Sequence, residues 1–208
     1  MRRAPQLDLA PLLGALADTD PDDVTTRILD ATAAVLSTSG LRRCTVEEIA
    51  ERANVGRTTI YRRFDGRDEI VQAVLARELR TFFLSVTEAV AHVDRLEDKL
   101  VEGFLMGLRS AESTLIVPLV RSEPDLLMFV LGDAGPIMEL VTGLLVTELR
   151  RQVPHVDVER ARHGAETVFR LAISFALLPA STLPLDDDEA ARRTLHELFD
   201  PLLNGVTR

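Results

Sequence analysis

Residues 45–64 read TVEEIAERANVGRTTIYRRF, and this stretch decides how the chain folds. Thr45 and Glu48 stand three positions apart at the start of an apolar pattern, as in a capping box, so a helix is expected to begin directly after Thr45. The Asn-Val-Gly sequence at 54–56 predicts a tight turn, because Asn and Gly both tolerate left-handed backbone. A second, short helix should then occupy residues 57–64.

A further helix is predicted on each side of this stretch. Upstream, apolar residues recur at helical spacing from Val24 to Leu36, and Gly40 ends that helix. Downstream, Asp65 or Gly66 caps a long helix whose first turn carries acids, which the positive end of the helix dipole favours. Three short helices with a turn between the second and third predict a helix-turn-helix, whose last helix enters the major groove of DNA.

The charge of residues 40–64 indicates the same function. The whole chain has a formal net charge of -9, yet this segment holds six arginines and three glutamates. Its arginines can neutralise phosphates or bind guanine edges, its threonines can bond phosphates or contact a thymine methyl, and Tyr61 can reach the DNA backbone. A solvated helix face is the alternative explanation for a charge run, but the capping box, turn and apolar spacing favour DNA binding.

Residues 27–70, RILDATAAVLSTSGLRRCTVEEIAERANVGRTTIYRRFDGRDEI, resemble the N-terminal domain of the TetR family of transcriptional regulators. The matching features include ILDA at 28–31, Gly40, IAERA at 49–53 and TIY at 59–61. The resemblance implies phosphate contacts from Thr45, Arg57, Thr59, Tyr61 and Arg67, and base contacts from Arg57, Thr58 and Arg62. With two more arginines of the basic segment, the predicted DNA-binding residues are Arg43, Thr45, Arg57, Thr58, Thr59, Tyr61, Arg62, Arg63 and Arg67.

The sequence departs from the family pattern at two positions. Gly56 stands where the family commonly has Ser at the start of the recognition helix, and Thr58 stands where it commonly has Gly. Glycine is a weaker cap by about a few tenths of a kcal/mol, so the helix should still form. Thr58 adds bulk in the groove and is expected to change which DNA sequence is bound.

The composition of the chain predicts an all-α protein. Aromatic residues make up 4% of the 208 residues, and long stretches are dominated by good helix formers. The single cysteine, Cys44, cannot form an internal disulfide, which favours a reducing compartment and hence the cytoplasm. No window contains the roughly 18 uninterrupted apolar residues of a membrane span, so no membrane association is expected.

The chain is predicted to have an N-terminal arm at 1–21, a helix-turn-helix DNA-binding domain at 22–67 and a helical effector-binding and dimerisation domain at 68–208. Beyond the long fourth helix, the expected helices are 96–110, 112–120, 124–131, 136–153, 158–178 and 187–203. The helices from 136 and 158 carry broad apolar stripes. Similarity to the family implies that this pair forms the four-helix bundle of a homodimer. Ordinary core packing within one chain is the alternative.

The resemblance also implies a pocket for a small effector, enclosed by helices between the DNA-binding domain and the dimerising pair. The candidate apolar lining residues are Phe104, Leu108, Leu115, Met128, Phe129 and Phe169, and the candidate anion-binding residues are Arg109, Arg121 and Arg170. For each of these residues, a place in the core or on the surface is a more common role than a ligand contact. The apolar majority favours a lipid-like or aromatic effector.

The sequence predicts no catalytic residue, metal site or cofactor. None of the four histidines has a glutamate three positions before it, as a Glu-x-x-His iron site requires, and no GxxxxGK or GxSxG motif occurs. We therefore expect a dimeric, ligand-responsive regulator of transcription that binds double-stranded DNA, most simply as a repressor. An architectural DNA-binding protein without an effector is the main alternative, and a helical enzyme is a more distant one.

Overall fold

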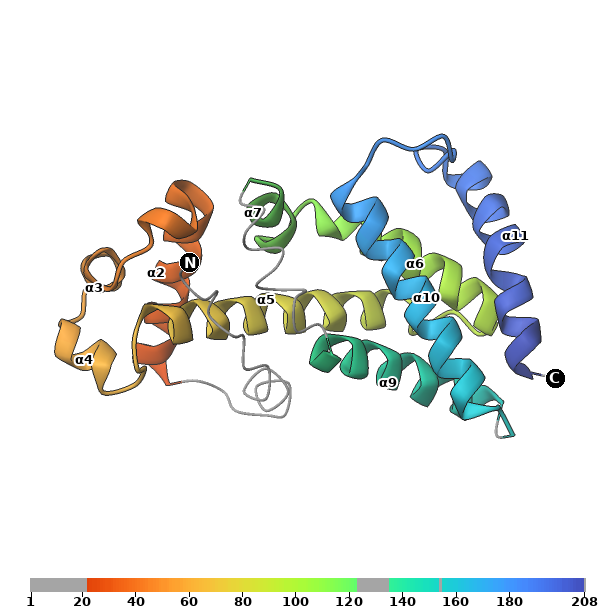
Figure 1. Cartoon of the computed structure of the whole chain (residues 1–208), viewed down its shortest axis with the longest axis horizontal. Helices are drawn as coiled ribbons and strands as arrows, with labels where there is room; N and C mark the ends of the chain where they lie inside the picture. The colour runs from red at the N-terminus through yellow and green to blue at the C-terminus, as the bar shows by residue number, and fades with distance from the viewer. Residues whose placement is uncertain (1–21, 123–134, 154, 208) are drawn as a thin grey trace, which may run out of the picture. The chain divides into compact units, whose positions relative to one another are not determined.

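The computed structural model describes residues 22–122, 135–153 and 155–207 (Figure 1). All regular elements in these ranges are α-helices, so the predicted all-α fold is confirmed. The helices are α2 (Asp23–Arg43), α3 (Val46–Ala53), α4 (Arg57–Tyr61), α5 (Arg67–Ala89), α6 (Leu96–Ala111), α7 (Ile116–Ser122), α9 (Gly135–Gln152), α10 (Val158–Leu177) and α11 (Asp188–Thr207). The predicted arm at 1–21 and the predicted helix at 124–131 lie outside the described residues.

The helices group into two compact units. Among the described residues, the first unit comprises 22–81 and 114–122, and the second comprises 82–113 and 135–207. The division between the units falls within α5, and the domain boundary expected at residue 67 stays a prediction. The N-terminal part of α5 buries Val71 and Val74, and its Arg77 pairs with Asp30 of α2 at 2.7 Å. These turns of α5 therefore pack with the predicted DNA-binding helices.

Buried isoleucines form the centre of the first unit. Ile28 of α2, Ile49 of α3 and Ile60 of α4 are all 0% exposed, as is Ile70 of α5. α2 packs against α3, and α3 against α4. Full burial of such a side chain contributes about 1.5 to 3 kcal/mol. Since α4 has only five residues and a helix so short is unstable alone, it depends on this packing.

Three local details of the first unit bear on the predicted helices. Gly40 interrupts α2 with a φ of 73°, a left-handed conformation that favours glycine, and one further turn follows it. α4 ends at Tyr61 instead of residue 64, because the chain turns after it. α7 begins at Ile116 instead of residue 112, which places Pro118 in a first turn, where its missing N–H removes no helical hydrogen bond.

α6, α10 and α11 surround the main core of the second unit (Figure 1). Its buried residues are Val101, Phe104, Leu105, Val168, Ala191, Leu195 and Phe199. The rings of Phe104 and Phe199 meet edge to face with their centroids 5.0 Å apart, a favoured aromatic geometry. A smaller cluster joins α9 to α10 through Val146, Leu149, Val156 and Ala161.

A line of ion pairs connects α6 to α11 at the edge of this core. The ion pairs are Glu102 with Arg192 and Arg109 with Asp188, and beyond them Nε2 of His196 lies 3.2 Å from Oδ1 of Asp98. The α11 residue number falls as the α6 number rises, so the two helices run antiparallel. Arg192 holds the pKa of the Glu102 carboxyl below its usual range, so this pair is charged at neutral pH.

Part of the apolar stripe predicted for dimerisation is already buried within a single chain. Ala161, Ala165 and Val168 of α10 are each at most 8% exposed, and α10 packs against α6, α9 and α11. Packing within one chain therefore accounts for these positions, which was the alternative to dimerisation in the sequence analysis. Dimerisation through α9 and α10 remains a prediction.

Among the described helices, no single one is long and apolar enough to cross a membrane. α6 and α7 would reach the required length and composition only if they were taken together as one bent segment.

Candidate DNA-binding face

α3 and the turn after it have the predicted capping geometry. The Thr45 hydroxyl oxygen accepts a hydrogen bond from the Glu48 backbone N–H at 3.2 Å, which confirms the hydroxyl half of the capping box. Asn54 adopts a left-handed conformation, with a φ of 52° and a ψ of 51°. The Val55 N–H then donates to the Ala50 carbonyl at 3.0 Å. The turn thereby directs the chain into α4 without leaving these end groups unpaired.

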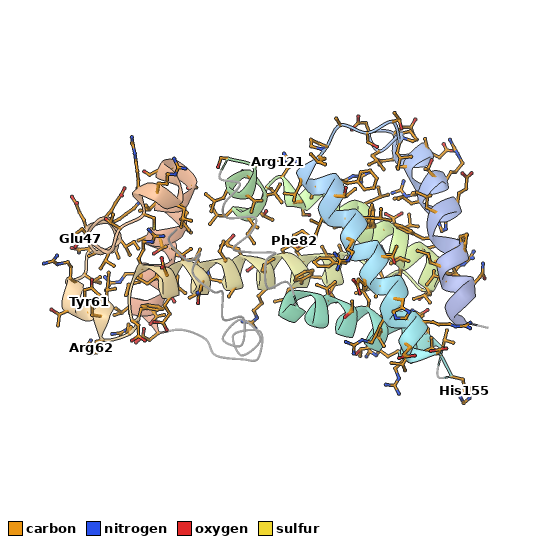
Figure 2. All side chains as sticks on the ribbon, viewed as in Figure 1. Glu47, Tyr61, Arg62, Phe82, Arg121 and His155 are labelled. Atoms are coloured by element: carbon orange, nitrogen blue, oxygen red, sulfur yellow. The ribbon has the colours of Figure 1, made fainter. Side chains whose placement is uncertain are left out.

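α4 has one buried face and one face in solvent. Ile60 is fully buried, while Arg57, Thr58, Tyr61 and Arg62 are exposed, Tyr61 at 56%. Figure 2 shows Tyr61 and Arg62 at the outer side of α4. The exposed side chains supply guanidinium groups, a hydroxyl and a phenol, which are the groups that contact phosphates and base edges.

The remaining predicted DNA-binding residues lie around this helix. Arg43 is exposed in the last turn of α2, and Thr45 is exposed at the start of α3. Thr59 is half-buried. Arg67, at the start of α5, lies within ion-pair distance of Asp68, with Nε and Oδ1 2.9 Å apart.

Arg63 has partners inside the first unit. Its Nη2 lies 2.5 Å from Oδ2 of Asp22, and its Nε donates to the Thr25 hydroxyl at 3.2 Å. The side chain is 20% exposed. The reason is that the turn after α4 brings Arg63 beside the start of α2. Although Arg63 is among the predicted DNA-binding residues, its charge is already compensated by Asp22.

Asp22 performs two roles that the sequence did not reveal. It caps α2, because its Oδ1 accepts from the Thr25 backbone N–H at 2.8 Å, and it also pairs with Arg63. The Arg63 hydrogen bond, followed by that from Thr25, holds the pKa of Asp22 well below its ordinary value of 3.8. The acidic run at 18–23 resembles a linker in the sequence, and the one local signal for the capping role is that an Asp often precedes the first residue of a helix.

Replacing Asp22 with Asn should lower stability at neutral pH, and by less as the pH falls. The amide can still cap α2, whereas the negative charge beside Arg63 is lost. A carboxyl whose pKa is lowered by folding stabilises the folded state above its unfolded pKa, and this contribution is lost as the pH falls through the folded value. The difference in unfolding free energy between wild type and Asp22→Asn is thus expected to be full at pH 7 and to shrink below about pH 4.

Urea unfolding at pH 7 and pH 2 measures this difference. Asp23→Asn is the matched control, because it removes the same charge at the neighbouring position, in the first turn of α2. An Asp22→Asn deficit that is equally large at both pH values would contradict the role of the Asp22 charge.

Cys44 is a packing residue. It is 0% exposed, and burial raises the pKa of its thiol to about 11. The thiolate is the reactive form of cysteine, so this side chain is unreactive at neutral pH.

The predicted effector-binding residues are distributed over both units. In the second unit, Phe104 lies in the main core, Leu108 packs against it, and Phe169 is half-buried. Leu115 and Arg121 belong to the first unit, and Met128 and Phe129 lie outside the described residues.

Two of the candidate anion-binding arginines have acidic partners in their own unit. Arg109 pairs with Asp188, and Arg170 pairs with Glu166 one turn earlier on α10 at 2.8 Å. The Phe104 ring contacts Phe175 and Phe199. Burial, aromatic packing and ion pairing therefore account for these three residues without a ligand, and their effector role stays a prediction.

A buried three-helix core that presents an exposed, arginine-bearing helix after a tight turn defines a helix-turn-helix DNA-binding protein. Comparison with known sequences identifies the family. Residues 28–74 match the family described as "Bacterial regulatory proteins, tetR family", and residues 96–201 match "Bacterial Tetracyclin repressor, C-terminal domain". The chain belongs to the TetR family of transcriptional regulators.

Individual relatives agree with this assignment. The chain is 28% identical to the HTH-type transcriptional regulator AlkX of Mycobacterium tuberculosis. The alignment spans 171 residues, which is 79% of this chain and 78% of the relative. Over 126 residues, 60% of this chain and 65% of the relative, it is 40% identical to the HTH-type transcriptional regulator YvkB of Bacillus subtilis.

A solved structure covers almost the whole chain. The TetR family repressor AlkX from Dietzia sp., implicated in biodegradation of n-alkanes, superposes with a TM-score of 0.67 at 25% identity. The match covers 91% of this chain and 100% of that chain. The fatty acid degradation regulator FadR from Bacillus halodurans shares the fold, with a TM-score of 0.61 at 17% identity over 87% of this chain and 96% of that one.

Proposed function

We propose that this regulator is a repressor that binds a palindromic DNA site as a homodimer in the cytoplasm and leaves it when a small, mainly apolar effector binds. The observation that carries the proposal is the exposed surface at α4. Thr58 and Tyr61 of the helix and Arg62 directly after it are exposed, while Ile60 anchors the helix in the core. A surface of this kind can contact phosphates and base edges together. The net charge of -9 for the whole chain favours a contact limited to this basic face.

Dimerisation follows from the small size of this surface. One five-residue helix contacts few base pairs, whereas two copies related by a two-fold axis can occupy successive major grooves about 34 Å apart. We assign the dimer contact to α9 and α10, as similarity to the family implies. Sedimentation at micromolar concentration tests this assignment, and a monomeric protein would reject it.

An apolar effector is supported by one comparison. The repressor AlkX from Dietzia sp., whose structure is similar, is implicated in biodegradation of n-alkanes, which are apolar compounds. The effector must bind more tightly to the conformation that no longer fits the DNA site. A coupling of about 1 to 3 kcal/mol would change DNA affinity about 5- to 150-fold.

Selection of bound duplexes from a random pool, at near-physiological salt, tests DNA recognition directly. A short palindrome should be enriched. The recovered duplex is then titrated with protein in the presence of n-alkanes and the corresponding alcohols and carboxylic acids. Sequence-selective binding that none of these compounds weakens would favour the architectural alternative, and the absence of any enriched sequence would reject sequence-selective regulation.

Replacing Arg62 with Ala is expected to weaken binding to the selected duplex by about 1 to 3 kcal/mol, if its guanidinium binds a guanine edge bidentately. Discrimination at one base position should relax at the same time. Fluorescence anisotropy with the selected duplex and single-base variants of it measures both effects. Arg52→Ala, on the exposed surface of α3, is the matched control for charge. An equal loss on random DNA would assign Arg62 to a phosphate contact.

A further inference from the structure

One arginine of the DNA-binding face is paired with an acid of the same face. Nη1 of Arg57, the first residue of α4, lies 2.9 Å from Oε1 of Glu47 in the first turn of α3. Both side chains are strongly exposed, at 64% and 63%. Figure 2 labels Glu47 as well as Tyr61, the last residue of α4, and Arg62, which follows it.

The Glu47 carboxylate carries its negative charge at the neutral pH at which DNA binding takes place. The hydrogen bond from Arg57 holds the pKa of Glu47 below its usual range, so the group is ionised at neutral pH. An acid at this position repels phosphates and cancels the charge of one arginine. Arg62 differs, because among the described residues no acid lies within ion-pair distance of it.

The pair is weak enough to be exchanged. An ion pair between exposed side chains typically changes an equilibrium by less than about fivefold. A phosphate or guanine edge placed at the right distance can therefore displace Glu47, because a bidentate contact with Arg is stronger. A phosphate that is poorly placed cannot displace it. Whether Arg57 pairs with Glu47 or with DNA should then depend on how close the DNA groups lie to its guanidinium.

We propose that Glu47 is a specificity-determining residue that acts through Arg57. On DNA of arbitrary sequence, Glu47 keeps the guanidinium, and Arg57 adds nothing to binding. On a matching site, a phosphate or a guanine edge of the DNA displaces Glu47 and binds the Arg57 guanidinium. This inference deepens the proposed function and rests on it, since it presupposes sequence-selective binding.

Salt dependence distinguishes the two states of Arg57. Each phosphate neutralised by a cation steepens the slope of log K against log salt by about 0.9 on duplex DNA. If Glu47 keeps Arg57 on random DNA, then Glu47→Gln should release the arginine there and steepen that slope by about 0.9. Affinity for random DNA should rise about two- to fivefold. The slope on the matching site should stay the same, because Arg57 is already engaged there.

The experiment uses the full-length chain, a duplex selected from the random pool and a random-sequence duplex of the same length. Binding is measured by fluorescence anisotropy from about 0.05 to 0.3 M salt. Glu51→Gln is the matched control, because it removes an exposed acid from the same helix. It should change affinity for both duplexes by the same small factor. Glu47→Asp, which keeps the charge, should preserve the wild-type difference in slope.

A double-mutant cycle tests whether the effect passes through Arg57. In an Arg57→Ala background, Glu47→Gln should no longer steepen the slope on random DNA. An effect that persists there, equal steepening on both duplexes, or a Glu51→Gln variant that behaves like Glu47→Gln would each overturn the inference. If the wild type shows no preference for any selected duplex, it is the proposed function that fails. Thermal melting of each variant confirms that the fold is intact.

Discussion

Replacing Ile60 with Ala is expected to lower the free energy of unfolding by about 2 to 5 kcal/mol and to abolish sequence-selective DNA binding. Ile60 is the buried side chain of α4 and is 0% exposed. Truncation removes apolar contacts and leaves a cavity that the surrounding side chains fill only partly. Because α4 is too short to form alone, the loss of its anchor should also release the exposed residues that face DNA.

Two control variants separate these effects. Ile60→Val keeps most of the buried volume and should cost about 0.5 to 1.5 kcal/mol while binding the selected duplex. Thr58→Ala changes the exposed side of the same helix and should leave stability within about 0.5 kcal/mol of wild type. Urea unfolding followed by circular dichroism measures stability, and anisotropy measures DNA binding. If Ile60→Ala binds the selected duplex normally, Ile60 does not anchor the recognition helix.

Replacing Phe199 with Ala is expected to destabilise the second unit by about 3 to 5 kcal/mol. Phe199 is 1% exposed, packs edge to face on Phe104 of α6 and belongs to the core that joins α6, α10 and α11. A loss of this size is a large part of the roughly 5 to 15 kcal/mol that stabilises a typical domain. The variant should therefore melt at a much lower temperature or fail to fold.

The neighbouring Leu198 provides the control on the same helix. It is 45% exposed, so Leu198→Ala removes much less buried surface and should cost far less stability at the same protein concentration. Phe199→Leu, which retains apolar volume, should fall between wild type and Phe199→Ala. Comparable losses for Leu198→Ala and Phe199→Ala would show that α11 buries a different face from the one in the structure.

The elements specified by short-range patterns were predicted well. The capping residue Thr45 and the left-handed Asn54 follow from rules that operate over three or four residues. Gly40 was expected to end its helix, and it interrupts α2 instead, which continues to Arg43. The exposed character of Tyr61 and Arg62 followed from the same local spacing. Helix ends without such signals were displaced, as at the end of α4 and the start of α7.

The pairing of charged side chains could not be predicted, because partners distant in sequence meet only after folding. Asp22 and Arg63 are 41 positions apart, and Glu47 and Arg57 are 10 apart across a turn. In the sequence, Arg57, Arg62 and Arg63 each add the same positive charge to the basic segment, and nothing distinguishes them. In the folded protein one is compensated near the start of α2, another is shared with α3, and Arg62 projects into solvent.

The sequence by itself therefore determined the helical class of this protein, the helix-turn-helix and the family to which it belongs, because periodicity, caps and turns are encoded within a few residues. Only the tertiary structure decided what each charged or aromatic side chain does. It placed Arg63 against Asp22, Arg57 against Glu47 and Phe104 against Phe199. The physical reason is that burial and ion pairing depend on distances in space, and packing sets those distances between residues that the sequence keeps apart.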